Sequence, residues 1–313
     1  MTTVTRREVW VGMLLYPRHT LPTAAAPILV ASALAHHDHV FALGPALAAL
    51  LAGWLVQLGG VVTDNYNNLR RHGDDLEHPR FVEALRAGVI TFRQLALAIA
   101  ACYGVAMLAG LYCVYVGGVP ALLIGLASIA ASLAYSSGPF PLGDRLGLGD
   151  PLFFVFFGLV QVIATYYVEA ASVVSPPLPV GIPAGTFTLT VFLASLPMAA
   201  LTTNILVIDN IRDLEFDREK NERTLAVIIG PKWSRVEYVG LLALAYAVPV
   251  WLFLRQGFSA WILLPLASIP YAVLVARRVF RFTTHDELIP MTPQAGQVLL
   301  MYAVLFAVGL ARG

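Results

Sequence analysis

Three aspartates recur at four-residue intervals directly after an apolar run. The segment from residue 209 to 230 reads DNIRDLEFDREKNERTLAVIIG, so the carboxylates of Asp209, Asp213 and Asp217 are expected on one helical face over two turns. Such a face repels itself by roughly 0.2–0.5 kcal/mol per neighbouring pair, and by more beside hydrocarbon. Mg²⁺ would remove this penalty, because it binds carboxylates together with phosphate oxygens and water. The alternative is a solvated helix end neutralised by its own bases, Arg212, Arg218 and Lys220.

A second acidic cluster ends an earlier apolar run. The segment from residue 63 to 80 reads TDNYNNLRRHGDDLEHPR, with Asp64, Asn65 and Asn68 at a helix end and Asp74 in the loop that follows. Alone it is weak, because Asn and Asp are ordinary turn and helix-terminal residues. The two clusters together resemble the two-sided arrangement in which metal ions bridge a diphosphate. They therefore predict a diphosphate site.

Arginines near these clusters are candidates to bind that diphosphate. Arg is suited to this because its planar guanidinium binds phosphate oxygens through two parallel hydrogen bonds. We expect two or three of the candidates to be ligands, and the others to be orientation charges or lipid headgroup contacts. The candidates are Arg18, Arg70, Arg71, Arg145, Arg212 and Arg223.

The composition indicates the elements that must position these residues. The 313 residues are 58% hydrophobic and only 12% charged, and the mean hydropathy is +0.74, whereas soluble domains are about 25% charged. This excludes a soluble protein and predicts one all-α integral membrane domain over residues 1–313. Nine spans of about 20 residues are expected. They cover residues 20–36, 41–66, 92–115, 119–135, 151–171, 187–211, 236–254, 259–276 and 294–311.

The distribution of charge gives this bundle a direction. With nine spans, every Lys and Arg except Arg255 and Arg312 falls on the side of the N-terminus, which the positive-inside rule identifies as cytoplasmic. The acids follow, with only Asp38 and Glu169 on the far side, although orientation does not require it. No removable signal peptide is expected. We expect a multi-pass protein of a bacterial or archaeal inner membrane, with membrane lipid and no nucleic acid among its partners.

Four segments resemble the UbiA-type superfamily of intramembrane prenyltransferases. They are YPRHTLPTAAAP, SGPFPLGDRLGLGD, FFVFFGLVQVIATYY and DNIRDLEFDREKNERTLAV. Within the superfamily, the first two are most similar to the branch that prenylates 1,4-dihydroxy-2-naphthoate to demethylmenaquinone. The last matches the second Asp motif of the branch almost position by position. The resemblance covers nearly the whole chain.

The resemblance implies a role for each candidate residue. The metal ligands for Mg²⁺ would be Asp64, Asn68, Asp74, Asp209, Asp213 and Asp217. The substrate-binding residues would be Arg18, Asn65, Asn68, Arg71, Arg145, Asp150, Asn210, Arg212 and Arg223. Catalytic roles would belong to Asp64, Tyr135, Asp209 and Asp213. The chain departs from the family where a fifth-position Asp of the first motif is Asn68, and where Glu222 replaces the usual Lys.

The implied reaction is ionisation of a prenyl diphosphate followed by attack of an aromatic acceptor. Metal and Arg would neutralise the leaving diphosphate, and the apolar bundle would shield the allylic cation. Tyr135, Tyr66 or Asp150 could orient or deprotonate the acceptor. An interfacial tyrosine belt would equally explain the two tyrosines, and a helix N-cap would explain Asp150.

Three alternatives remain open on the sequence. The same fold could act on 4-hydroxybenzoate, homogentisate or another lipid precursor. A transporter or ion-binding membrane protein would also carry acids, but usually near the membrane centre and in repeated halves. A catalytically inactive scaffold would explain the amide at Asn68.

Overall fold

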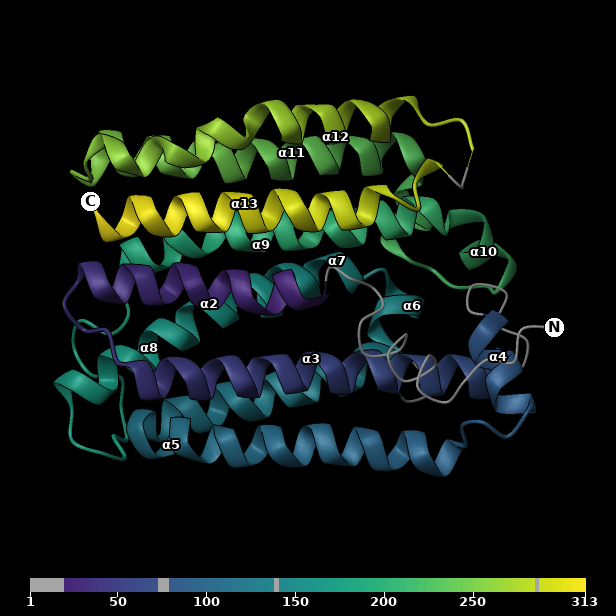
Figure 1. Ribbon diagram of the computed structural model, residues 1–313, viewed down its shortest axis with the longest axis horizontal. Helices are drawn as coiled ribbons and strands as arrows, with labels where there is room; N and C mark the ends of the chain where they lie inside the picture. The colour runs from purple at the N-terminus through teal and green to yellow at the C-terminus, as the bar shows by residue number, and fades with distance from the viewer. Residues whose placement is uncertain (1–19, 73–78, 138–140, 285–286) are drawn as a thin grey trace.

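The computed structural model describes residues 20–72, 79–137, 141–284 and 287–313, and the regular structure in these residues is helical throughout (Figure 1). In chain order the helices are α2 (Thr20–His37), α3 (Leu43–His72), α4 (Pro79–Arg86), α5 (Phe92–Ser136), α6 (Leu142–Leu146), α7 (Gly149–Leu152), the π-helix η1 (Phe153–Val160), α8 (Gln161–Val174), α9 (Leu189–Arg212), α10 (Leu214–Glu219), α11 (Leu225–Arg255), the 3₁₀-helix η2 (Ala260–Ser268), α12 (Ile269–Arg281) and α13 (Met291–Ala311). Seven helices in this part of the chain are long and apolar enough to cross a membrane.

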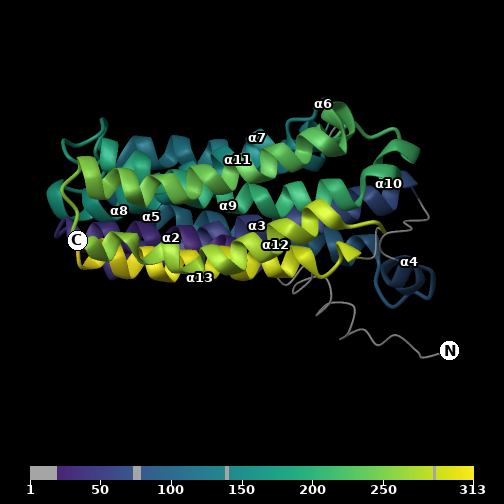
Figure 2. The ribbon, with the colours of Figure 1, turned by 90° about the horizontal axis from the view of Figure 1, so that it is seen from above.

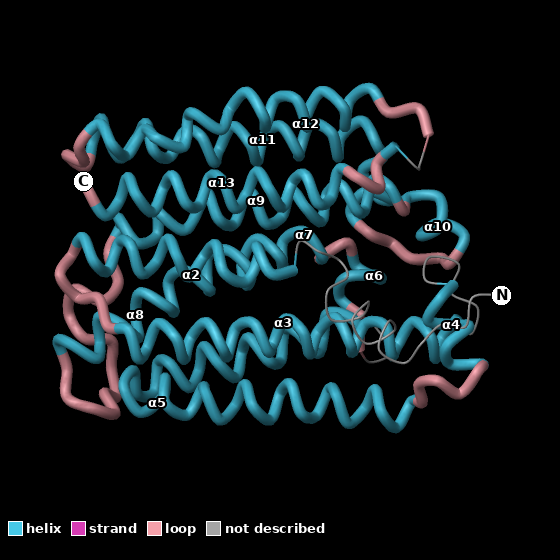
Figure 3. Tube along the Cα trace, in the orientation of Figure 1, coloured by secondary structure: helices cyan, strands magenta, loops and turns pink. Residues whose placement is uncertain are grey.

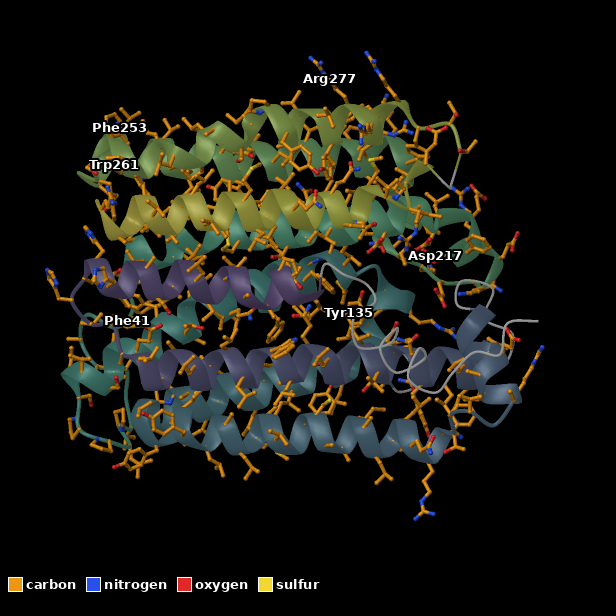
Figure 4. All side chains as sticks on the ribbon, viewed as in Figure 1. Phe41, Tyr135, Asp217, Phe253, Trp261 and Arg277 are labelled. Carbon is orange, nitrogen blue, oxygen red and sulfur yellow. The ribbon has the colours of Figure 1, made fainter. Side chains whose placement is uncertain are left out.

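The long helices run along a common axis and form one bundle (Figures 1 and 2). The short helices α4, α6 and α10 gather at one end, which we call the carboxylate end because the Asp-rich segments lie there (Figure 1). The C-terminus lies at the opposite end (Figure 1). The labelled aromatic residues Phe41, Phe253 and Trp261 also lie toward that end (Figure 4).

Helix α5 is a hairpin of two antiparallel arms. Gly118 interrupts the helix with φ 63° and ψ −147°, a conformation that is open almost only to glycine. The Tyr103 and Ser132 hydroxyls, which are nearly equidistant from Gly118 in the chain, lie 2.9 Å apart. The segment after α8 closes the turn, because the Val119 amide donates to the Pro179 carbonyl at 2.9 Å. The expected spans at 92–115 and 119–135 are these two arms.

Helix α9 is the most deeply buried long helix of the described residues. Its Met198, Ile205 and Ile208 side chains are fully buried, and the helix contacts α2, α8, α11, α13 and η1. By contrast, α5 leaves Leu97, Leu108 and other large apolar side chains exposed along its outer face. Contiguous exposed apolar faces of this kind are expected of helices that contact lipid.

Several helix boundaries differ from those expected. The expected span at 236–254 lies inside α11, which begins 11 residues earlier at Leu225 and is interrupted at Gly230 (φ 80°, ψ 164°). A Gly–Pro pair is typical of a turn, and in the structure Gly230 and Pro231 instead lie within α11 at the interruption. The expected span at 151–171 is a continuous rod formed by α7, η1 and α8. Helix α2 matches its expected span but is not among the seven apolar candidates.

Candidate active site

The spacing of the three aspartates predicts one continuous helix, but the structure divides this segment between α9 and α10. Helix α9 ends at Arg212, Asp213 has φ −91° and ψ 5°, and α10 begins at Leu214. The amide of Asp213 still donates to the Asp209 carbonyl at 2.8 Å, and that of Asp217 donates to the Asp213 carbonyl at 2.9 Å. Asp209 and Asp213 line the cavity described below, whereas Asp217, in α10, is not among its lining residues.

Arg212 joins Asp209 and Asp213. Its Nη1 donates to Asp209 Oδ1 at 2.6 Å, its Nε donates to Asp213 Oδ1 at 2.7 Å, and its Nη2 donates to Asp213 Oδ2. The three side chains are partly buried, with 14–20% of each exposed. The guanidinium thus neutralises much of the repulsion between two carboxylates on neighbouring turns.

Thr292, at the start of α13, also contacts Asp209. Its hydroxyl donates to Asp209 Oδ1 at 2.6 Å and lies 3.4 Å from Arg212 Nη1. Before α13, Glu287 accepts hydrogen bonds from the Thr283 and Thr284 hydroxyls at 2.9 and 3.2 Å. These bonds lower the pKa of Glu287, because they stabilise its charged form.

Asp217 and Arg223 lie at the carboxylate end, in α10 and in the loop between α10 and α11. Asp217 is buried and accepts a hydrogen bond from the Thr224 hydroxyl at 2.9 Å, whereas Arg223 is exposed. Thr224 precedes α11, so Asp217 links α10 to the start of that helix. In Figure 4, Asp217, a residue of α10, lies toward the carboxylate end, and Tyr135 lies nearer the middle of the bundle.

The segment between α5 and η1 packs against both Tyr135 and the loop before α11. Gly147 ends α6 with φ 65°, and a Cβ at this position would lie 3.4 Å from the Arg223 carbonyl and closer still to Ile228. The ring of Tyr135 lies against Gly143. Asp150 is buried and accepts hydrogen bonds from Asn210 Nδ2 at 3.1 and 3.3 Å. Asp150 therefore links α7 to α9.

The end of α3 brings the first acidic cluster to the same place. Asp64 and Asn65 line the same cavity as Asp209 and Asp213, and Asn65 Nδ2 donates to the Val61 carbonyl at 2.9 Å. The side chains of Asn68 and Arg71 lie outside the described part of the structure, as do Arg18 and Asp74.

A cavity of about 570 Å³ extends from these polar residues into the bundle. Its polar mouth is formed by Asp64, Asn65, Asp209, Arg212 and Asp213. Its walls are formed by α3, both arms of α5, η1 and α8, and they include Met107, Leu111, Leu122, Phe153, Phe156, Phe157 and Val160. On α3 the lining runs from Ala49 to Asn65, about 24 Å at 1.5 Å per residue. The cavity is therefore long and apolar, with charge at one end.

The donor set fits a Mg²⁺ ion that is bound together with a phosphate ligand. No group of three or more His, Cys, Asp or Glu side chains in the described residues comes together to hold a metal on its own. Mg²⁺ is usually bound by one or two carboxylates, with phosphate oxygens and water completing its octahedron. Asp64 on one side of the mouth and Asp209 and Asp213 on the other can supply such carboxylates.

The structure divides the predicted site residues into three groups. Six line the cavity: Asp64, Asn65, Tyr135, Asp209, Arg212 and Asp213. Five described residues are not among its lining: Arg145, Asp150, Asn210, Asp217 and Arg223. Four fall outside the described residues or have undescribed side chains: Arg18, Asn68, Arg71 and Asp74.

Sequence reasoning missed two kinds of residue at this site. Thr292 has no sequence signal, because its contact with Asp209 joins residues 83 positions apart. Gln57 and Gln161 also line the cavity. Each is an isolated amide within an expected span, and polar residues in such places are functional candidates.

Comparisons with known proteins agree on one family. The profile described as the UbiA prenyltransferase family matches residues 24–291. The chain is 30% identical over 295 residues to the 1,4-dihydroxy-2-naphthoate octaprenyltransferase of Mycobacterium tuberculosis, covering 94% of each chain.

Two solved structures share the fold. A UbiA homolog from Aeropyrum pernix K1 matches with a TM-score of 0.69 and 19% identity, over 92% of this chain and 96% of that one. A UbiA homolog from Archaeoglobus fulgidus bound to GPP and Mg²⁺ matches with a TM-score of 0.56 and 13% identity, over 95% and 100%.

Proposed function

The chain belongs to the UbiA prenyltransferase family, and on that premise we propose that it transfers a polyprenyl group from a prenyl diphosphate to 1,4-dihydroxy-2-naphthoate in a Mg²⁺-dependent reaction. The proposal rests on one observation: a cavity that has carboxylates and Arg212 at its mouth and a mostly apolar body. A prenyl diphosphate has the same division, with a charged head and a long apolar tail. The naphthoate acceptor is supported by the name of the Mycobacterium tuberculosis relative.

The residues at the mouth would bind the diphosphate head. Asp64, Asp209 and Asp213 would hold Mg²⁺, together with Asn68 and Asp74. When bound, Mg²⁺ neutralises the diphosphate and makes it a better leaving group. Arg212 adds positive charge at the same place, held by its bonds to Asp209 and Asp213. Asp217, buried against Thr224, would instead order the loop that carries Arg223.

The walls below the mouth would protect the allylic cation that forms as the C–O bond breaks. Phe153, Phe156, Phe157 and Tyr135 line this part of the cavity. Aromatic faces attract cations, and apolar side chains exclude the water that would trap the cation as an alcohol. The electron-rich acceptor ring then forms the new C–C bond at the carbon that carries its carboxylate. The carboxylate leaves as CO₂, and its bonding electrons restore the aromatic ring.

The chain is a multi-pass integral membrane protein with seven long apolar helices among its described residues. We propose nine crossings, with α2 and the two arms of α5 each counted as one. The bases favour a cytoplasmic carboxylate end and N-terminus, in the inner membrane of the cell.

The test is prenyl transfer by the purified protein in lipid nanodiscs. Labelled geranylgeranyl diphosphate and Mg²⁺ are supplied with 1,4-dihydroxy-2-naphthoate, 4-hydroxybenzoate or homogentisate in separate reactions. We expect a prenylated product from the naphthoate and a loss of at least about 100-fold in the Asp213→Asn variant, because one oxygen ligand loses its charge. Glu215→Gln is the matched control, since Glu215 is exposed and pairs only with Arg218 among the described contacts.

Two results would overturn the proposal. Product with another acceptor but none with the naphthoate would refute the acceptor. Full activity of the Asp213→Asn variant would refute the assignment of the active site to this mouth.

A further inference from the structure

A polar group interrupts the apolar wall of the cavity about halfway along α3. Gln57 lines the cavity, and its Nε2 donates to the Thr23 hydroxyl on α2 at 2.5 Å. Gln161 on α8 lines the cavity nearby, because its Nε2 donates to the Ala24 carbonyl at 2.9 Å and would lie 3.1 Å from a Cβ on Gly53. Three helices thus bring amide and hydroxyl groups together inside a mostly apolar space.

Gln57 retains an unused acceptor at this place. The residue is 92% buried, since 8% of its surface is exposed. Its Oε1 is buried and has no hydrogen-bond donor among the residues that the structure describes. A buried acceptor left in this condition is costly, because it has lost its hydrogen bonds to water. A ligand that places an O–H or N–H group beside it would recover that cost.

The two proposed substrates differ in what they can offer to Gln57. The prenyl tail is hydrocarbon and has no donor, so it leaves Oε1 unsatisfied. The aromatic acceptor carries ring hydroxyls, each with one donor hydrogen. Gln57 lies seven residues below Asp64 on α3, about 10 Å at 1.5 Å per residue. A fused aromatic ring attacking next to the diphosphate would span much of that interval.

We propose that Gln57 Oε1 accepts a hydrogen bond from a ring hydroxyl of the aromatic acceptor and thereby sets which acceptors this cavity takes. The inference rests on the proposed function and deepens it. The bond from Gln57 Nε2 to Thr23 fixes the amide before the acceptor arrives, so little side-chain entropy is lost on binding. An acceptor without the hydroxyl leaves Oε1 unpaired and binds weakly.

The first experiment replaces Gln57 by methionine, which has similar length and no acceptor of comparable strength. We expect the KM for 1,4-dihydroxy-2-naphthoate to rise about 5- to 150-fold, the range for a lost buried hydrogen bond. The KM for the prenyl diphosphate should stay within about twofold of wild type. Thr165→Val is the matched control, because Thr165 is also a lining residue but its hydroxyl already donates within its own helix, to the Gln161 carbonyl at 2.7 Å.

The second experiment removes the hydroxyl from the ligand. The inhibition constants of 1-hydroxy-2-naphthoate and 4-hydroxy-2-naphthoate are measured against the naphthoate substrate in wild type and Gln57→Met. One analogue should bind wild type at least about fivefold more weakly than the other, and this difference should vanish in the variant. Equal weakening of both analogues by the substitution would overturn the inference, because it would show that Gln57 only shapes the cavity or holds ordered water.

Failure of the proposed function is distinguishable from failure of this inference. If the wild-type protein prenylates 4-hydroxybenzoate or homogentisate and not the naphthoate, the proposed acceptor is wrong. The Gln57→Met comparison is then made with the acceptor that reacts and its dehydroxylated analogue. If the wild-type protein prenylates none of the three acceptors, both the proposed function and the role of Gln57 are refuted. If Gln57→Met does not fold, as judged by its unfolding temperature, the wild-type ranking of the two analogues decides, and equal affinities overturn the inference.

Discussion

Arg212 shows how one side chain can control the charge at the mouth of the cavity. Its guanidinium binds Asp209 and Asp213 together, and the Thr292 hydroxyl reinforces the same oxygen of Asp209. Two carboxylates beside an apolar cavity would otherwise repel each other. Arg212 offsets this repulsion and places a positive charge where a diphosphate would lie.

Replacing Arg212 by glutamine should lower kcat/KM for the prenyl diphosphate about 10- to 100-fold, since hydrogen bonds to charged groups contribute about 1.5–3 kcal/mol each. Arg218→Gln is the control, because Arg218 pairs with Glu215 at the exposed surface and such pairs contribute little. Steady-state kinetics with varied diphosphate measures the effect. Equal activity of the two variants would show that Arg212 does not face the substrate.

At the scale of the element, the α5 hairpin depends on one backbone conformation. Gly118 has a positive φ, and a Cβ there would lie 1.8 Å from the Pro179 carbonyl oxygen. The hairpin returns the second arm along the cavity, where it contributes Ser128, Ser132 and Tyr135 to the lining. The turn therefore positions a wall of the cavity far from the turn itself.

The Gly118→Ala variant should lose at least about 2 kcal/mol of stability, from an unfavourable φ and a clash with backbone that must move. Gly104→Ala is the matched control on the first arm, where a Cβ would meet nothing within 4 Å. Thermal unfolding in detergent compares the two variants. An unfolding temperature for Gly118→Ala equal to that of Gly104→Ala would contradict the role of the turn.

At the scale of the molecule, the length of the cavity bears on the substrate. The chain has two cysteines, and of these Cys113 lines the cavity. The Tyr103 ring packs beside Gly59 on α3, and Ser132 lies beside Gly60, so these residues share one level. On α5, Cys113 lies ten residues beyond Tyr103, away from the mouth. On α3, Asp64 lies four residues beyond Gly60, toward the mouth. At 1.5 Å per residue, Cys113 is therefore about 21 Å from the carboxylates along the bundle.

This depth predicts which prenyl diphosphates protect Cys113 from a small thiol reagent in a Cys102→Ser background. An extended isoprene unit adds about 5 Å, as four C–C bonds of about 1.5 Å each. Geranylgeranyl thiodiphosphate with Mg²⁺ should slow modification at least about tenfold, and geranyl thiodiphosphate should slow it little. The rate is followed by mass spectrometry. Equal protection by both lengths would show that the tail does not follow this cavity.

The orientation of the bundle can be tested with reporter fusions. The C-terminus lies at the end opposite the carboxylates (Figure 3), so a fusion of alkaline phosphatase after Gly313 should be active outside the cytoplasm. A fusion after Glu219, in α10 at the carboxylate end, should be inactive. The reverse pattern would invert the proposed orientation.

Hydropathy, the charge pattern and one motif were enough to predict the apolar helices, the clustering of acids and bases at one end, and the family. Each of these follows from local features: the length of an apolar run, the positions of Lys and Arg, and a motif within about 20 residues. Hydropathy requires no knowledge of neighbours, because lipid is the solvent for every span. The acid at Asp64 and those at Asp209 and Asp213 were expected together, and the structure places them on one cavity.

Which polar residues line that cavity depends on how the helices pack, and it could not be predicted from the sequence. The spacing of Asp217 matches that of Asp213, but Asp217 lies in the next helix, α10, and accepts a hydrogen bond from Thr224. The contact of Thr292 with Asp209 and the bond of Gln57 to Thr23 join different helices. Helical periodicity fixes a residue's face on its own helix, whereas the partner across that face depends on how helices distant in sequence pack together.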